Sequence, residues 1–149
     1  MNWIRITHSD LELVLNKPQL EILKAAELAS PGRDIAESTI SSVVSRVRAE
    51  ISAGQINALD ADHLKIPPEL KDCALCLALE ALQARIPDMP MPQAISRRAD
   101  LARETLQRVA DGRLPVTPPI CGIKTAKAKG ARVVKSRRQN FSSKTMEGL

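Results

Sequence analysis

The sequence predicts an all-α fold, a small bundle of about five helices followed by a long, extended, basic C-terminal arm. Apolar residues make up 44% of the 149 residues, which is enough for a buried core. Trp3 and Phe141 are the only aromatic residues, and glycines are few. An aliphatic core rich in Ala and Leu favours helices over sheets.

The segment Pro67–Ile86 is expected to be the central helix of this bundle. It is rich in Leu, Ala, Glu and Gln, and its prolines suit a first helical turn. Between Cys73 and Leu79 no side chain is charged. Because a helix that is apolar on nearly every side cannot face water, other helices must surround it. About seven consecutive apolar residues are too few to span a bilayer.

Four other helices are expected around it. Thr7–Asp10 has the Thr-x-x-acid pattern of a capped start and predicts a helix of about two turns, followed by a second helix from Gln19 to about Ala29. Asp34–Ala53 has apolar residues at steps of three and four, and the last helix runs from about Gln93 to Ala110. Their apolar stripes predict the packing residues Leu20, Ile22, Leu23, Leu28, Ile35, Ala36, Ile40, Val43, Val44, Val47, Ile51, Ile95, Ala99, Ala102, Leu106 and Val109.

The connecting segments divide the chain into two parts. Residues 55–66 show no sustained periodicity and are expected to form a loop, and residues 87–92 are a stiff, proline-rich connector. The proline-rich segment Leu114–Pro119 is expected to lead the chain out of the domain. The sequence therefore predicts a helical domain at residues 1–114 and an extended, basic arm at residues 115–149 that is disordered when free.

Positive charge is concentrated at the C-terminal end. From Ile120 onward eight Lys or Arg stand against one Glu, so this segment carries +7 and the rest of the chain −2. Three interpretations are open: an arm that aids solubility, a sequence-independent binder of nucleic-acid phosphates, or an arm that folds onto a partner protein. Phe141 and Met146 favour the last, because a purely electrostatic arm needs no apolar anchors.

No pattern for catalysis stands out, and we expect no enzyme, no cofactor and no metal site. Cys73-x-x-Cys76 lacks the second ligand pair of a zinc site, so both cysteines are expected to be small buried side chains. Asp60, Asp62 and His63 lack the Gly and the distal Glu of a calcium loop, and we expect a solvated loop there. His8 is expected to belong to a helix cap. The three cysteines form no disulfide framework and no signal peptide is visible, so a cytoplasmic protein is expected.

Five segments together resemble a known family. They are Trp-Ile-x-Ile-Thr-x-x-Asp-Leu at 3–11, Ile-Ser-x-Val-x-Ser-x-Val-x-x-Glu-Ile at 40–51, Pro-Pro-Glu-Leu-Lys-Asp at 67–72, Val-Ala-Asp-Gly at 109–112 and Arg-x-x-Phe-x-x-x-x-Met-x-Gly at 138–148. In this layout the chain resembles the small head-completion proteins (head-to-tail connectors, or neck proteins) of tailed phages, most closely those of Mu-like phages. Residues 55–67 depart from that family, since they lack the aromatic of an Arg-Tyr-x-x-Pro segment.

The resemblance implies a structural subunit of the virion neck, assembled in the host cytoplasm into a homo-oligomeric ring, typically of twelve copies. The implied partners are the portal protein, neighbouring copies, the next neck or tail protein and the genomic DNA, which passes through the channel without sequence-specific contacts; no membrane is implied. By position, the arm that binds the portal or a neighbour would comprise Arg132, Arg137, Arg138, Phe141, Met146 and Gly148. The alternative from the basic arm is a nucleic-acid-binding protein of phage DNA packaging or regulation.

Overall fold

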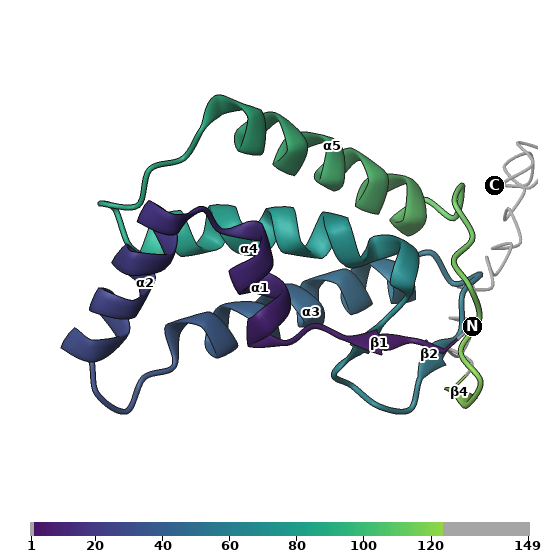
Figure 1. The fold of residues 1–149 in the computed structure, drawn as a ribbon. Helices are drawn as coiled ribbons and strands as arrows, with labels where there is room; N and C mark the ends of the chain where they lie inside the picture. The colour runs from purple at the N-terminus through teal and green to yellow at the C-terminus, as the bar shows by residue number, and fades with distance from the viewer. Residues whose placement is uncertain (1, 124–149) are drawn as a thin grey trace, which may run out of the picture.

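The structure, a computed structural model, describes residues 2–123 and confirms the all-α prediction. The five helices of this part are α1 (His8–Val14), α2 (Lys17–Ala29), α3 (Ile35–Ala53), α4 (Lys71–Arg85) and α5 (Gln93–Ala110). A 3-10 turn, η1 (Pro68–Leu70), precedes α4. Figure 1 shows α3, α4 and α5 stacked roughly along one another, with α1 lying against α3 and α4 and α2 at one end.

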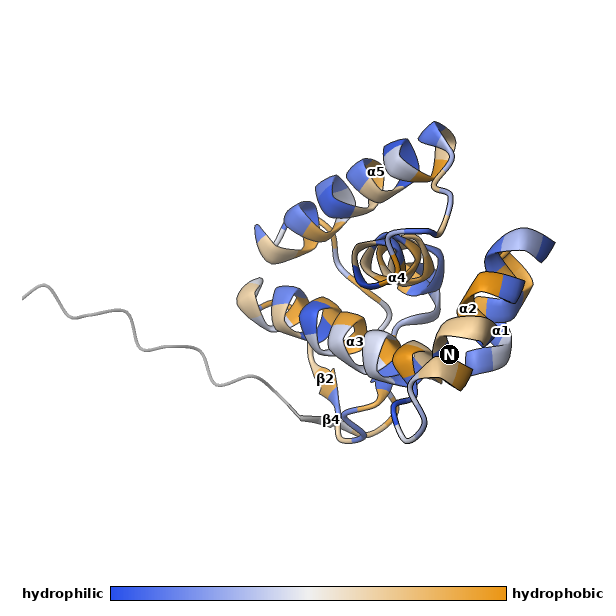
Figure 2. Ribbon diagram, turned by 90° about the vertical axis from the view of Figure 1, so that its left-hand side faces the viewer, coloured by the Kyte–Doolittle hydropathy of each residue, from blue (hydrophilic) through white to orange (hydrophobic). Residues whose placement is uncertain are grey.

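The helix α4 lies at the centre, as the sequence predicted. Figure 2 views α4 nearly along its axis, with α5 on one side, α3 on another and α1 with α2 on a third. Six of its side chains are buried: Ala74, Leu75, Leu77, Ala78, Leu79 and Leu82. These residues point in several directions around the helix, which is why no single amphipathic face was visible in the sequence.

The two long neighbours of α4 contribute one apolar stripe each. In α3 the buried positions include Ile40, Val43 and Val47, and in α5 they are Ala99, Ala102, Leu106 and Val109. Both stripes confirm the sequence prediction. By contrast, the predicted packing residue Leu28 of α2 is 82% exposed, because it lies outside the stripe of Leu20, Leu23 and Ala26 that α2 packs against the core.

Two consecutive capping boxes fix the starts of the two N-terminal helices, α1 and α2. Thr7 accepts a hydrogen bond from the Asp10 backbone N–H, and the Asp10 side chain accepts one from the Thr7 N–H. Asn16 and Gln19 form the same reciprocal pair at the start of α2. Therefore α2 begins at Lys17, two residues before the predicted start, because Asn16 supplies the cap.

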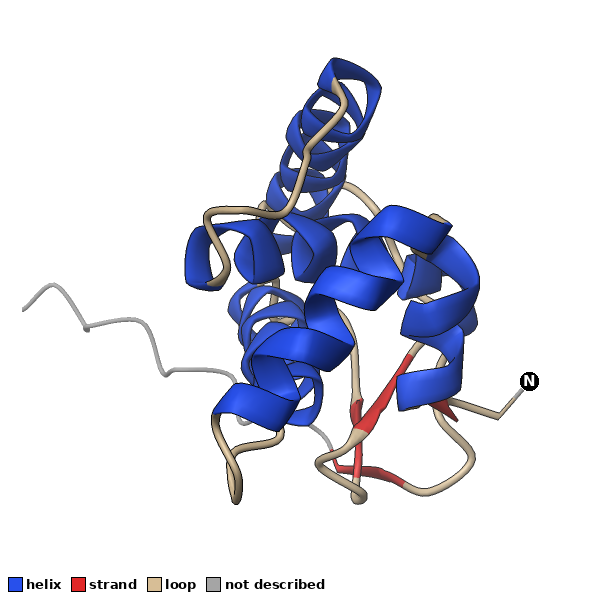
Figure 3. Cartoon of the chain, turned by 60° about the vertical axis from the view of Figure 1, so that its left-hand side comes forward, coloured by secondary structure: helices blue, strands red, loops and turns tan. Residues whose placement is uncertain are grey.

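Four strands of two residues each were not expected from the sequence. β1 (Ile4–Arg5) pairs antiparallel with β3 (Lys65–Ile66), and β2 (Leu59–Asp60) pairs antiparallel with β4 (Gly122–Ile123). Figure 3 shows these short strands gathered at one end of the helices. The segment 55–66 predicted as a loop therefore contains two strands, which are too short to produce a period-two pattern.

The chain after α5 stays on the domain instead of leaving it at Leu114. Val116 is buried, and its backbone N–H donates to Asn57 Oδ1 at 3.0 Å. The indole N–H of Trp3 donates to the Thr117 carbonyl at 2.8 Å. Long-range hydrogen bonds thus hold this proline-rich segment, and the sequence contains no local sign of them. The predicted disorder of the free arm falls largely on residues 124–149, outside the described residues.

Candidate protein-interaction surface

The predicted binding residues Arg132, Arg137, Arg138, Phe141, Met146 and Gly148 lie outside the described residues. Within residues 2–123, one open groove with an apolar lining could receive a partner.

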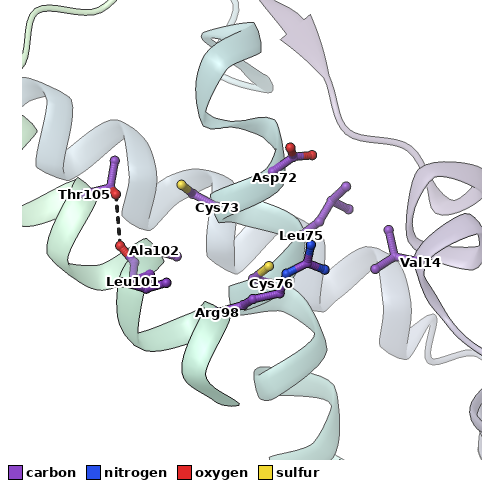
Figure 4. A pocket seen from close by; sticks show the side chains of 9 residues that line it. All are labelled: Val14, Asp72, Cys73, Leu75, Cys76, Arg98, Leu101, Ala102 and Thr105. Carbon is purple, nitrogen blue, oxygen red and sulfur yellow. Dashed lines mark hydrogen bonds between the residues drawn. The ribbon is translucent and has the colours of Figure 1, made fainter. Parts of the chain in front are cut away.

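The groove lies between the C-terminal end of α1, the first half of α4 and the middle of α5. It has a volume of about 310 Å³. Figure 4 shows Val14 approaching it from α1, two cysteines from α4, and Leu101, Ala102 and Thr105 from α5. Its complete lining is Val14, Asp72, Cys73, Leu75, Cys76, Arg98, Leu101, Ala102 and Thr105.

Apolar side chains beside the groove are exposed to solvent. Leu101 is 62% exposed and Val14 is 39% exposed, whereas Leu75 and Ala102 beneath them are buried. Leu101 lies off the buried stripe of α5, between charged neighbours. An isolated leucine on an Arg-rich helix face is the sequence signal for this surface, and hydrophobic periodicity does not single it out because Leu101 lies off the apolar stripe.

Cys73 and Cys76 line this groove and are only half-buried, which corrects the prediction that both are buried core residues. One helical turn separates them, so both thiols lie on the α4 face that α1 and α5 leave uncovered. Burial raises the pKa of Cys73, and the nearby Cys76 and Asp72 raise it further. Burial also raises the pKa of Cys76, against an opposing effect of Arg98. Both shifts lower the fraction of thiolate, which is the nucleophilic form, at these two positions.

The rim of the groove is polar and carries both signs of charge. Figure 4 shows Arg98 reaching from α5 toward α4, and Asp72 stands at the α4 end. Further along α5, Arg103 forms ion pairs with Glu80 and Asp100. An apolar floor with a polar rim is the usual composition of a protein-binding surface.

The other candidate motifs of the sequence have different roles in the structure. Asp60 is buried rather than solvated, and its carboxylate accepts the Asp62 backbone N–H at 2.8 Å. Asp62 pairs with Arg5 at 2.6 Å, and that hydrogen bond lowers the pKa of its carboxyl. His8 makes no capping bond, since Thr7 and Asp10 form the cap, and its ring instead lies between Glu12 and Glu27.

Within residues 2–123 no helix combines the length and the apolar content needed to cross a bilayer. Comparison of the chain with protein-family models, with curated proteins and with solved structures found no match.

Proposed function

We propose that this chain is a structural subunit of the neck of a tailed phage. In this proposal, copies of the chain form a ring below the portal that completes the head, extends the DNA channel and supports tail attachment, without catalysis. Two features support it: the all-α fold and the series of segments that resemble neck proteins of Mu-like phages.

The observation that carries the proposal is the open groove beside Leu101 and Val14. Both side chains expose apolar surface to water. A partner that covers this surface gains about 25 cal/mol for each Å² of apolar area removed from water. We assign the groove to the arm of a neighbouring copy, whose Phe141 and Met146 are its large apolar anchors near the end of a basic, polar segment.

The length of the arm permits this contact. Residues 124–149, if extended at about 3.3 Å per residue, span on the order of 85 Å. The helix α4, with 15 residues at 1.5 Å each, is only about 22 Å long. An arm that starts beside β4 can therefore reach a neighbouring copy with length to spare.

Genetic complementation tests the proposal. In a phage that lacks this gene, particles seen by electron microscopy should be filled heads that have lost their DNA or carry no tails, with free tails alongside. Complementation with the Phe141→Ala, Met146→Ala double variant, which leaves charge intact, should leave this defect in place. A matched Ser142→Ala, Ser143→Ala variant should restore tailed virions.

The groove is tested by the same assay. Leu101→Asp should prevent the formation of tailed virions, whereas Leu28→Asp, at an 82% exposed leucine on another helix, should not. Empty, unpackaged proheads in the absence of the gene would point instead to the DNA-binding alternative. In that case the Phe141→Ala, Met146→Ala variant would retain salt-sensitive DNA binding and function. Normal tailed virions without the gene would contradict both proposals.

A further inference from the structure

Three side chains that commonly bind metals meet where α1, α2 and α3 come together. His8 is the first residue of α1, Glu27 lies in the last turn of α2, and Asp34 is the N-cap residue of α3. One possible ligand atom from each lies within 4.8 Å of those of the other two. The three residues are separated in sequence, and only the tertiary fold brings them together.

The spacing of these atoms fits a shared ion better than a direct contact. His8 Nε2 and Glu27 Oε1 are 3.8 Å apart, which is longer than the 2.7–3.2 Å of a hydrogen bond. Two ligands of one tetrahedral zinc ion, each bonded at about 2.1 Å, lie about 3.4 Å apart. A small divalent ion therefore fits between the two side chains after a shift of a few tenths of an ångström.

The remaining atoms of the cluster are suitable for supporting an ion. Asp34 uses Oδ1 to accept the Glu37 backbone N–H at 2.8 Å, which holds the carboxylate and leaves its second oxygen for another partner. On the other side of the imidazole, His8 Nδ1 lies 3.7 Å from Glu12 Oε1. A carboxylate that accepts the second ring N–H of a metal-bound histidine is a common arrangement, and Glu12 would reach that distance after an approach of about 0.5 Å.

The charge around the cluster also favours a cation. Among residues 2–123, neither Glu12, Glu27 nor Asp34 forms a salt bridge with a lysine or arginine, although Arg33 borders the same hollow. By contrast, Asp10, Asp62 and Glu80 each have a basic partner. Three carboxylates around one imidazole thus outnumber the two arginines, Arg5 and Arg33, that line the adjoining hollows.

We propose that His8, Glu27 and Asp34 bind a divalent first-row transition ion of the zinc class, with water completing its coordination. The imidazole nitrogen favours zinc over calcium or magnesium, which prefer oxygen ligands only. The proposal is independent of the neck function.

The site would stabilise the least buried long helix of the domain. In α2 only Gln19 and Leu23 are buried, and Ala26 in its second half is partly buried against the core. An ion bound to Glu27, His8 and Asp34 would join the end of α2 to the starts of α1 and α3. Metal binding should therefore raise the thermal stability of the domain.

The test uses the full chain with Cys121→Ser, which removes the exposed thiol as a competing ligand. The protein has two histidines, so long-range ¹H–¹⁵N spectra during a ZnCl₂ titration report on each ring separately. The ring nitrogens of His8 should shift with saturation, while those of the exposed His63 stay unchanged. Equal shifts of both rings, or a shift of His63 alone, would overturn the proposal.

Matched variants identify the carboxylate ligand by calorimetry. Glu27→Gln should weaken zinc binding by at least about 10-fold, whereas Glu21→Gln, an exposed residue on the same helix with the same charge change, should leave it unchanged. CaCl₂ and MgCl₂ should bind at least about 10-fold more weakly than ZnCl₂. Zinc affinity that is the same in both glutamine variants would place the ion elsewhere and reject the site.

Discussion

The guanidinium of Arg48 holds the segment between α3 and α4 in place. It donates to the carbonyls of Asp60, Asp62 and Lys65 at 2.7–3.0 Å, and it lies 5.6 Å from the centre of the Trp3 ring. Burial lowers the pKa of Arg48, and nearby Asp60 and Asp62 oppose that change. One side chain thus satisfies three backbone acceptors of a segment that has almost no regular structure.

Arg48→Lys should therefore lower the free energy of unfolding by about 2 kcal/mol, because a lysine cannot reach three carbonyls with the geometry of a planar guanidinium. Urea unfolding followed by the fluorescence of Trp3, the single tryptophan, measures this loss. Arg46→Lys is the control, since Arg46 is exposed on the same helix. Equal free energies of unfolding for the two variants would show that the hydrogen bonds from Arg48 to the three carbonyls do not stabilise the fold.

At the scale of elements, the ends of α3 and α5 approach each other unusually closely. Gly54, the C-cap residue of α3, has an ordinary helical φ of −66°. A Cβ added to it would lie 2.4 Å from the Val109 carbonyl oxygen. The glycine is thus required by the contact between two helices, not by its own backbone conformation.

Local propensity and tertiary packing predict opposite effects of Gly54→Ala. Helix propensity alone favours alanine by up to about 1 kcal/mol, whereas the clash with Val109 should cost about 1–3 kcal/mol and dominate. Thermal unfolding should show a lower midpoint for this variant. Gly32→Ala serves for comparison, because Gly32 has φ +87° and open space around it, so only backbone strain is expected there. A stabilised Gly54→Ala protein would contradict the close approach.

At the scale of the whole molecule, residues 115–123 close the domain over its N-terminal end. Val116, Thr117 and the strand β4 connect this segment to Asn57, Trp3 and β2. A chain of 149 residues therefore forms a folded unit that runs at least to residue 123. The predicted domain boundary at residue 114 therefore lies too early, because residues 115–123 pack on the helical domain.

Truncation tests where the folded unit ends. A chain ending at Ile123 should unfold at the same temperature as the full chain. A chain ending at Leu114 should lose about 3 kcal/mol, because it removes the burial of Val116 and the hydrogen bond to the Trp3 indole. The fluorescence of Trp3 should also shift to longer wavelength as the ring gains access to water. If both truncated chains match the full chain, residues 115–123 are not part of the folded unit.

The amino-acid sequence by itself determined the five helices, the central place of α4 and the buried stripes of α3 and α5. These features follow from local propensity, from the hydrophobic periodicity of α3 and α5 and from the uninterrupted apolar run of α4. The +7 charge of the C-terminal segment and its apolar residues were also visible directly, and the role proposed for them stays a prediction.

Only the tertiary structure decided the short strands, the return of residues 115–123 and both candidate sites. The groove exists because α1 and α5 leave part of α4 uncovered, so half-buried Cys73 and Cys76 could not be told from core residues. The cluster of His8, Glu27 and Asp34 joins three elements whose sequence separations carry no motif. Contacts between distant residues depend on how helices pack, and a local pattern contains no information about that packing.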